Sequence, residues 1–311
     1  MAAERSNRRI PMNLATHTHA RWGDGDRIGA ATLLTPERRL AALSLARTGN
    51  IYQMGRQISA ASPFMAPNQT PFVLSSAATW RNTIKMRRSM GAENDAGSNL
   101  ERIEMNVHVG THIDALGHFS IGDELYGGRS APDTMGDFGL NDIGIEHCPP
   151  IITRGVCLDL SGLDGGPFLE SGRAIGPDDL ARAADTAGVA FQAGDVACLH
   201  TGWGRHYVTD NAKYCAGEPG IDEAAARWLT SRDVVAIGAD SMAVEVLPNP
   251  QHPRLMMPVH QHCLAESGVY LIENLFMDEL VRDGVHEFCF ILLPVPFKGA
   301  TGSPAQPIAM V

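Results

Sequence analysis

The sequence predicts an α/β domain in which strands and helices alternate along most of the chain. Short apolar runs rich in β-branched residues recur from about residue 103 to residue 293, as expected for strands covered on both faces. Segments with helix-start signals lie between these runs, and this alternation is typical of layered α/β folds. Because no repeat or linker divides the chain, we expect one domain over residues 21–311, preceded by a flexible N-terminal arm over residues 1–20.

The first helix is expected to begin near Pro36, because Thr35 is a good N-cap and proline is favoured in a first helical turn. Residues 60–100 mix Pro, Ser, Asn and Gly with short apolar pieces, which predicts loops with at most short strands or helices.

The remaining strands and helices are predicted from apolar runs and from helix-start signals. The apolar runs predict strands over residues 103–108, 154–160, 195–200, 233–238, 268–273 and 286–293. Helix signals predict helices over residues 177–187, 222–231, about 258–266 and about 277–283.

The composition excludes several classes of protein. The 311 residues are 44% hydrophobic and carry a formal net charge of −10 without a basic stripe, so we expect neither a nucleic-acid partner nor a membrane partner. The six cysteines form no CxxC pair, and the polar N-terminus lacks the apolar core of a secretory signal. We therefore expect a cytoplasmic protein with reduced cysteines.

A dense group of histidines stands in the run His108-Val-Gly-Thr-His112-Ile-Asp114-Ala-Leu-Gly-His118. All its spacings are even, so a straight strand would place the four polar side chains on one face. A strand would also hold His108 and His112 roughly 13 Å apart, too far for two ligands of one metal ion. The chain must therefore fold back between them, and Gly110 supplies the permissive backbone.

A helix is the alternative that also pairs His108 with His112. Val, Gly and Thr form helices poorly, Asp114 would point away, and the Glu that follows the first His in helical zinc proteases is missing. The segment is therefore predicted to be a strand that runs into a tight loop.

The residue types point to a metal-dependent reaction. Imidazoles and a carboxylate suit Zn, Mn or another divalent ion, and a cation removes the cost of burying Asp114. His118 is the natural general acid and base, because histidine titrates near neutral pH.

A second polar group stands near the C-terminus. Glu273 ends an apolar strand, where a carboxylate needs a partner, and His260 lies on the preceding predicted helix. Both could face the first group, either to add a second metal or to orient substrate. His262 is the rival of His260, because one helical turn does not bring both to one face.

The pattern His108-x-Gly-Thr-His112-x-Asp114-Ala-x-x-His118-Phe119 resembles the signature of the cyclase and bacterial kynurenine formamidase family, which includes isatin hydrolase. The resemblance extends over most of the chain. It includes the block from Arg21 to Ala30, the block from Gly194 to Trp203, and the C-terminal Gly302-Ser-Pro304.

The resemblance implies a swivelling β/β/α fold with a central mixed sheet flanked by helices, in a homodimer or a homotetramer. It implies His108, His112 and Asp114 as ligands of a first metal and His118 as the catalytic acid/base. In formamidases the same Asp bridges a second metal held by a later His and Glu, and the matching residues here are His260 and Glu273. Glu273 is accordingly both a metal-ligand candidate and a catalytic candidate.

Three departures separate the chain from the formamidases. Leu116 stands where they usually have Pro, the interval from His260 to Glu273 is one residue longer, and much of residues 1–100 is additional. The expected function is therefore hydrolysis of an amide, cyclic amide or lactone-type bond of a small substrate by metal-activated water. A metal-dependent lyase or cyclising enzyme and a non-catalytic metal-stabilised binding protein are the alternatives.

Overall fold

A nine-stranded mixed sheet organises the protein in its computed structural model, of which residues 21–311 are described. The sheet order is β1-β17-β15-β9-β11-β13-β14-β4-β16. The strands are β1 (Ile51–Gln53), β4 (His112–Asp114), β9 (Ile151–Asp159), β11 (Val196–His200), β13 (Ala236–Ala239), β14 (Tyr270–Glu273), β15 (Glu287–Leu292), β16 (Gly302–Pro304) and β17 (Ile308–Met310). The expected N-terminal arm, residues 1–20, lies outside the described residues.

The centre of the sheet is parallel and its flanks are antiparallel. β9, β11, β13 and β14 run parallel to one another, whereas β15 and β17 on one side and β4 and β16 on the other pair antiparallel. The predicted α/β class with a mixed sheet flanked by helices is confirmed, and five of the six predicted strands form with shifted ends.

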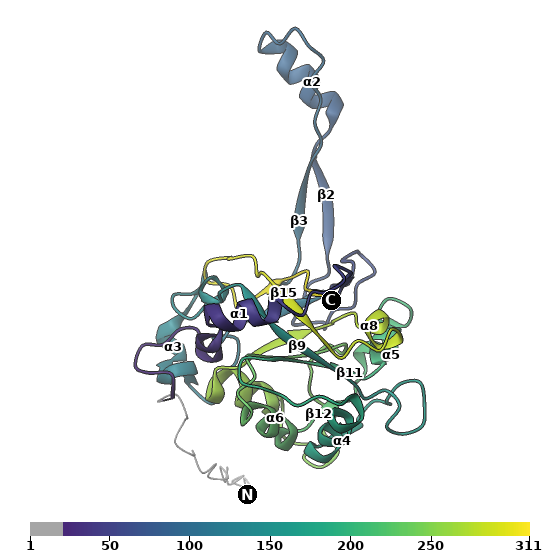
Figure 1. Ribbon diagram of the computed structural model, residues 1–311. Helices are drawn as coiled ribbons and strands as arrows, with labels where there is room; N and C mark the ends of the chain where they lie inside the picture. Colours follow the sequence, from purple (N-terminus) through teal and green to yellow (C-terminus); the bar gives the residue numbers. More distant parts are fainter. Residues whose placement is uncertain (1–20) are drawn as a thin grey trace, which may run out of the picture.

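Helices cover the sheet on both sides. In Figure 1, α1 (Pro36–Leu43) lies on one side of the sheet, and α4 (Pro177–Ala187) and α6 (Glu223–Thr230) lie on the other. The remaining helices are α2 (Trp80–Ser89), α3 (Ala131–Thr134), α5 (Asn211–Cys215), α7 (Pro258–His260) and α8 (Asp278–Arg282). Short 3₁₀-helices span Gly29–Leu33, Tyr126–Gly128, Ile145–His147 and Trp203–His206, and a π-helix, Gln261–Ser267, continues α7.

Local signals explain where the helices begin. The Thr35 hydroxyl accepts a hydrogen bond from the Arg38 backbone N–H at 3.3 Å, and Asp222 accepts one from the Ala225 N–H at 2.7 Å. These contacts satisfy backbone donors that a first helical turn leaves free. α4 has the predicted bounds, because Pro177 opens it and Gly188, with a left-handed backbone, ends it.

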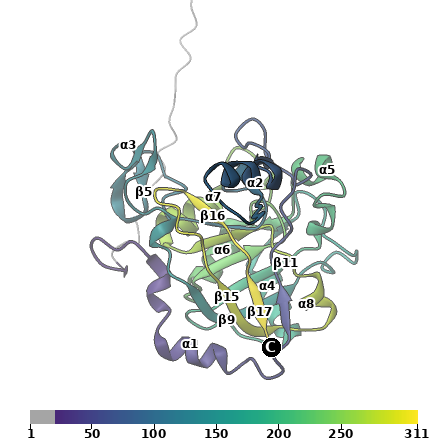
Figure 2. The same cartoon turned by 90° about the horizontal axis from the view of Figure 1, so that it is seen from above.

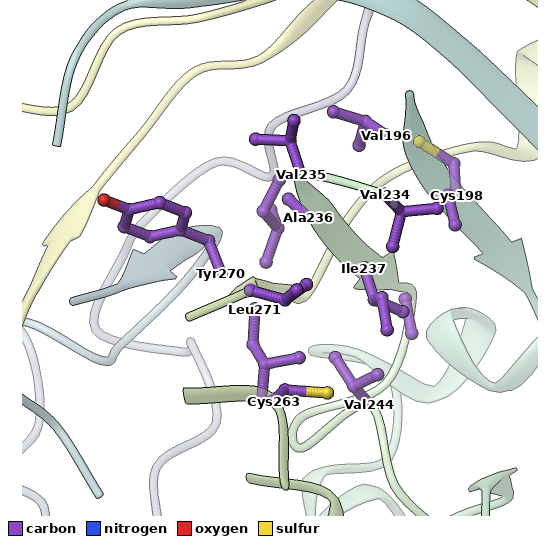
Figure 3. Packing of buried hydrophobic residues seen from close by; sticks show 14 of the residues in the cluster. Val196, Cys198, Val234, Val235, Ala236, Ile237, Val244, Cys263, Tyr270 and Leu271 are labelled. Atoms are coloured by element: carbon purple, nitrogen blue, oxygen red, sulfur yellow. The ribbon is translucent and has the colours of Figure 1, made fainter. Parts of the chain in front are cut away.

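The core lies between the parallel strands and the helices beneath them. Figure 3 shows Val196 and Cys198 of β11, Ala236 and Ile237 of β13, and Tyr270 and Leu271 of β14 packed together. These side chains are almost fully buried. This packing supports the edge of the sheet at which β11, β13 and β14 end.

Four short strands form two small ribbons beside the main sheet, β5 (Glu124–Leu125) with β6 (Arg129–Ser130) and β7 (Met135–Gly136) with β8 (Gly139–Leu140). A third small sheet pairs β10 (Ala174–Ile175) with β12 (Gly220–Ile221). In the described part of the chain, the helices are too short or too polar to cross a bilayer.

Residues 73–104 differ most from the sequence-based expectation. β2 (Val73–Ala78) and β3 (Leu100–Glu104) pair antiparallel, and α2 joins their far ends. Figure 1 shows this segment projecting from the rest of the protein, and Figure 2 views it end-on. We call it the hairpin extension. The prediction of loops with short elements therefore understated how regular this segment is.

Candidate metal centre

The backbone turns sharply between His108 and His112, as the spacing predicts. Gly110 has φ +77°, and a Cβ atom there would lie 2.6 Å from Cγ1 of Ile58. The two imidazole rings are therefore 4.9 Å apart between centroids. The predicted strand over residues 103–108 is wrong: β3 ends at Glu104, and the site strand, β4, follows the bend at His112. The polar residues Asn106 and His108 form turns instead.

The pairing of β4 with β14 brings three acidic and basic groups together. His112 stands opposite Glu273 in the ladder, and its Nε2 atom lies 3.1 Å from Oε2 of that carboxylate. The same Nε2 lies 3.5 Å from Oδ1 of Asp114, two residues further along β4 on the same face. His112 and Asp114 are completely buried, and Glu273 is nearly so.

His108 and His118 close the other side of Asp114. The Nδ1 atom of His108 lies 2.8 Å from Oδ1 of Asp114, and its Nε2 lies 3.0 Å from the Thr301 hydroxyl. The rings of His108 and His118 stack with their centroids 4.1 Å apart. The loop thus carries His118 to within reach of the same carboxylate.

His260, and not His262, faces the site. The Nε2 atom of His260 lies 3.1 Å from Oε1 of Glu273 and 3.7 Å from Oδ2 of Asp114. His262 instead contacts Glu266 through Nδ1 at 2.8 Å and the Thr230 hydroxyl through Nε2 at 2.9 Å.

Two donor sets share Asp114. Ligand atoms of His108, Asp114 and His118 lie within 4.8 Å of one another, and so do those of His112, Asp114 and Glu273. Both Asp114 oxygens and Nε2 of His112 are buried and have no well-aligned hydrogen-bond partner. Buried polar atoms without partners are costly, and a divalent cation is the group that this set of imidazoles and carboxylates fits.

Hydrogen bonds outside the site fix the orientation of two imidazole rings. His112 donates from Nδ1 to the Gly110 carbonyl at 2.9 Å, and His260 donates from Nδ1 to Glu245 at 2.6 Å. Each ring therefore turns Nε2 toward Asp114 and Glu273, as metal-binding histidines do.

The electrostatics of the site separate the histidines. Burial alone would lower the pKa of His112, but Asp114 and Glu273 outweigh burial and raise the pKa to about 10. Burial is likewise outweighed at His260, where Glu245 and Glu273 raise the pKa to about 10. For His118, burial prevails over the attraction of Asp114 and lowers the pKa to about 3. His118 is therefore neutral at pH 7.

Glu245 is a residue of the site that the sequence analysis missed. It is 1% exposed and accepts hydrogen bonds from the backbone N–H groups of Val259 and His260 as well as from the imidazole. Its signal was a single carboxylate within the apolar run Ala-Val-Glu-Val-Leu, where a charge needs a partner.

The sequence of this chain is similar to known proteins over most of its length. Residues 34–246 match the cyclase family, described as "Putative cyclase". A kynurenine formamidase of Bordetella petrii is 26% identical over 260 residues, which cover 83% of this chain and 96% of that protein.

Solved structures share the fold. The crystal structure of a novel cyclase superposes with a TM-score of 0.83 at 27% identity, covering 95% of this chain and 97% of that one. Isatin hydrolase A from Ralstonia solanacearum superposes with a TM-score of 0.64 at 18% identity, covering 88% of this chain and 97% of that one.

Proposed function

Because this chain belongs to the cyclase family, we propose that it is a metal-dependent hydrolase that cleaves an amide, cyclic amide or lactone-type bond of a small substrate. One observation carries the proposal: the buried Asp114 belongs to two sets of donor atoms, and neither of its oxygens has a well-aligned hydrogen bond. The relatives named kynurenine formamidase support the choice of an amide bond.

The residues that would hold the metal are His108, His112 and Asp114, with His260 and Glu273 as candidates for a second ion. Zn or Mn fits these donors best. When bound, such an ion polarises a carbonyl oxygen and lowers the pKa of water toward neutrality.

His118 performs the proton transfers in this proposal. Its neutral imidazole accepts a proton from the attacking water and delivers it to the leaving nitrogen or oxygen. Phe119 forms an apolar wall beside it, with its ring centroid 5.1 Å from that of His118 and 4.7 Å from that of His260. Glu273 is held between His112 and His260 and so aligns both rings.

The test combines metal analysis with a substrate screen. The purified protein is loaded with Zn or Mn, and N-formyl aromatic amines, cyclic imides and lactones are screened in ¹⁸O-labelled water. We expect turnover with one labelled oxygen in the acid product. We expect no turnover by Asp114→Asn, which keeps the shape of the side chain but removes its negative charge. Turnover without label would instead show a lyase or cyclising enzyme, and full metal occupancy without turnover would show a binding protein.

A further inference from the structure

A cavity lies beside the loop that carries His108 and His112, because Arg56 in its lining is hydrogen-bonded to Thr111 of that loop. Its volume is about 840 Å³, in the range of small-molecule sites. Arg56, Tyr207 and Phe276 form an apolar and cationic wall, and the amides of Gln53, Gln57 and Gln306 supply polar groups. None of the candidate metal ligands lines this cavity.

The cavity and the metal loop share a wall. The backbone N–H of Arg56 donates to the Thr111 hydroxyl at 2.8 Å, and that hydroxyl donates to the Asn274 carbonyl at 2.6 Å. Thr111 lies directly before the candidate ligand His112. The backbone that carries Arg56 is thereby tied to the loop that carries the metal centre.

Arg56 is a half-buried cation for which residues 21–311 supply no carboxylate partner. Its Nε and Nη2 atoms are buried and make no hydrogen bond, and within residues 21–311 its guanidinium forms no ion pair. Arg129 and Arg154, whose side chains are each 15% exposed, pair instead with Asp142 and Asp195 at 2.7 and 3.0 Å. A desolvated guanidinium without a carboxylate is costly, so the Arg56 site is suited to an anion from outside the chain.

Aromatic rings and a hydroxyl define the shape of that anion. Tyr207 is 7% exposed, and its buried hydroxyl, which lies beside Ser62, has no well-aligned hydrogen-bond partner. The Arg56 guanidinium lies 4.9 Å from the Tyr207 ring centroid and 5.5 Å from that of Phe276. Glu279, the acidic residue of the lining, is exposed. Flat apolar walls beside one cation and one hydroxyl favour a planar group that carries a negative charge.

We propose that this cavity binds a small aromatic carboxylate, with the carboxylate on the Arg56 guanidinium and the Tyr207 hydroxyl and the ring against Phe276. The proposal concerns a site separate from the metal centre and holds whether or not the chain is a hydrolase.

Benzoate is the probe, and calorimetric titration gives its Kd for the full chain. We expect saturable binding to the wild type, binding at least tenfold weaker to Arg56→Gln, and severalfold weaker binding to Tyr207→Phe. Benzamide, which has the same shape without the charge, is expected to bind at least tenfold more weakly than benzoate. Arg205→Gln is the matched control, because Arg205 is exposed and lies outside the lining.

The Asp114→Asn variant distinguishes benzoate binding in the cavity from benzoate binding at the metal centre. Unchanged benzoate affinity in that variant supports the proposal, whereas loss of binding would place the carboxylate on the metal and overturn it. Failure of benzoate to bind the folded wild type, or wild-type affinity in both Arg56→Gln and Tyr207→Phe, would also overturn it. Thermal melting of each variant checks that it is folded.

Discussion

Glu245 holds the imidazole of His260 by a 2.6 Å hydrogen bond from Nδ1, so that Nε2 of the ring faces Glu273 and Asp114. The carboxylate is itself fixed by two backbone N–H groups at the start of α7. A side chain remote from the candidate ions thus determines the orientation of one of their ligands.

Glu245→Gln should weaken binding of the second metal about 10- to 100-fold, because the amide holds the ring less firmly and makes Nε2 a poorer ligand. Glu266→Gln is the control, since Glu266 contacts His262 in the same manner but away from the site. Metal titration followed by elemental analysis measures both. Equal metal affinity in the two variants would contradict the role assigned to Glu245.

His118→Ala should reduce kcat about 10²- to 10⁴-fold and leave metal content unchanged, because the general acid and base is removed. The measurement pairs steady-state kinetics with elemental analysis of the same sample. His118 also lies within the donor set of His108 and Asp114. Loss of metal in parallel with activity would therefore make His118 a ligand.

Metal binding should release protons at neutral pH. The carboxylates around His112 and His260 outweigh burial and raise the pKa of both imidazoles to about 10. Each ring is therefore positively charged at pH 7.5 and carries a second proton, which a cation must displace. Titration calorimetry in buffers of different ionisation enthalpy should show release of about two protons. The number should fall as the pH approaches 10, and no release at pH 7.5 would refute the charged state assigned to these rings.

The ion pair between Asp159 and His200, at 2.9 Å, should make stability depend on pH. Burial opposes the shift at Asp159, but His200 lowers the pKa of the carboxyl to about 2, so its contribution is present above pH 3.8 and is lost as the pH falls through 2. Burial alone would lower the pKa of His200, but the hydrogen bond with Asp159 outweighs burial and raises it. The contribution of His200 to stability is therefore present below pH 6.5 and is lost as the pH rises through the raised pKa.

Asp159→Asn should therefore lower Tm most between about pH 4 and 6.5, by about 1–3 °C for a pair of which one side chain is partly exposed. Calorimetric melting from pH 3 to 9 checks this expectation. A loss that does not vary with pH would mean that the contact acts as an ordinary hydrogen bond.

The helices and the parallel strands were predictable because their signals are local. Pro177 and Gly188 mark the two ends of α4, and the apolar runs of β11 and β14 need only burial on both faces. The hairpin extension was not predictable in this way. Its strands alternate weakly, and an exposed ribbon has no buried face to impose a period.

The residues of the candidate site, too, were only partly predictable from the sequence. The run from His108 to His118 could be found because all its members lie within one loop and one short strand. The choice between His260 and His262 could not be made, because a π-helix follows α7 and turns the backbone at a rate that helical periodicity does not describe. Glu245 had no motif around it, and its role depends on a tertiary contact.

The register between His112 of β4 and Glu273 of β14 has a consequence for how this protein can change length in evolution. Deleting or inserting one residue within β14 would move Glu273 to the opposite face of the sheet and remove it from the centre. The turn at the tip of the hairpin extension has no such constraint on the centre. We therefore expect insertions and deletions among homologues of this chain to occur at residues 90–99 and not at residues 270–273.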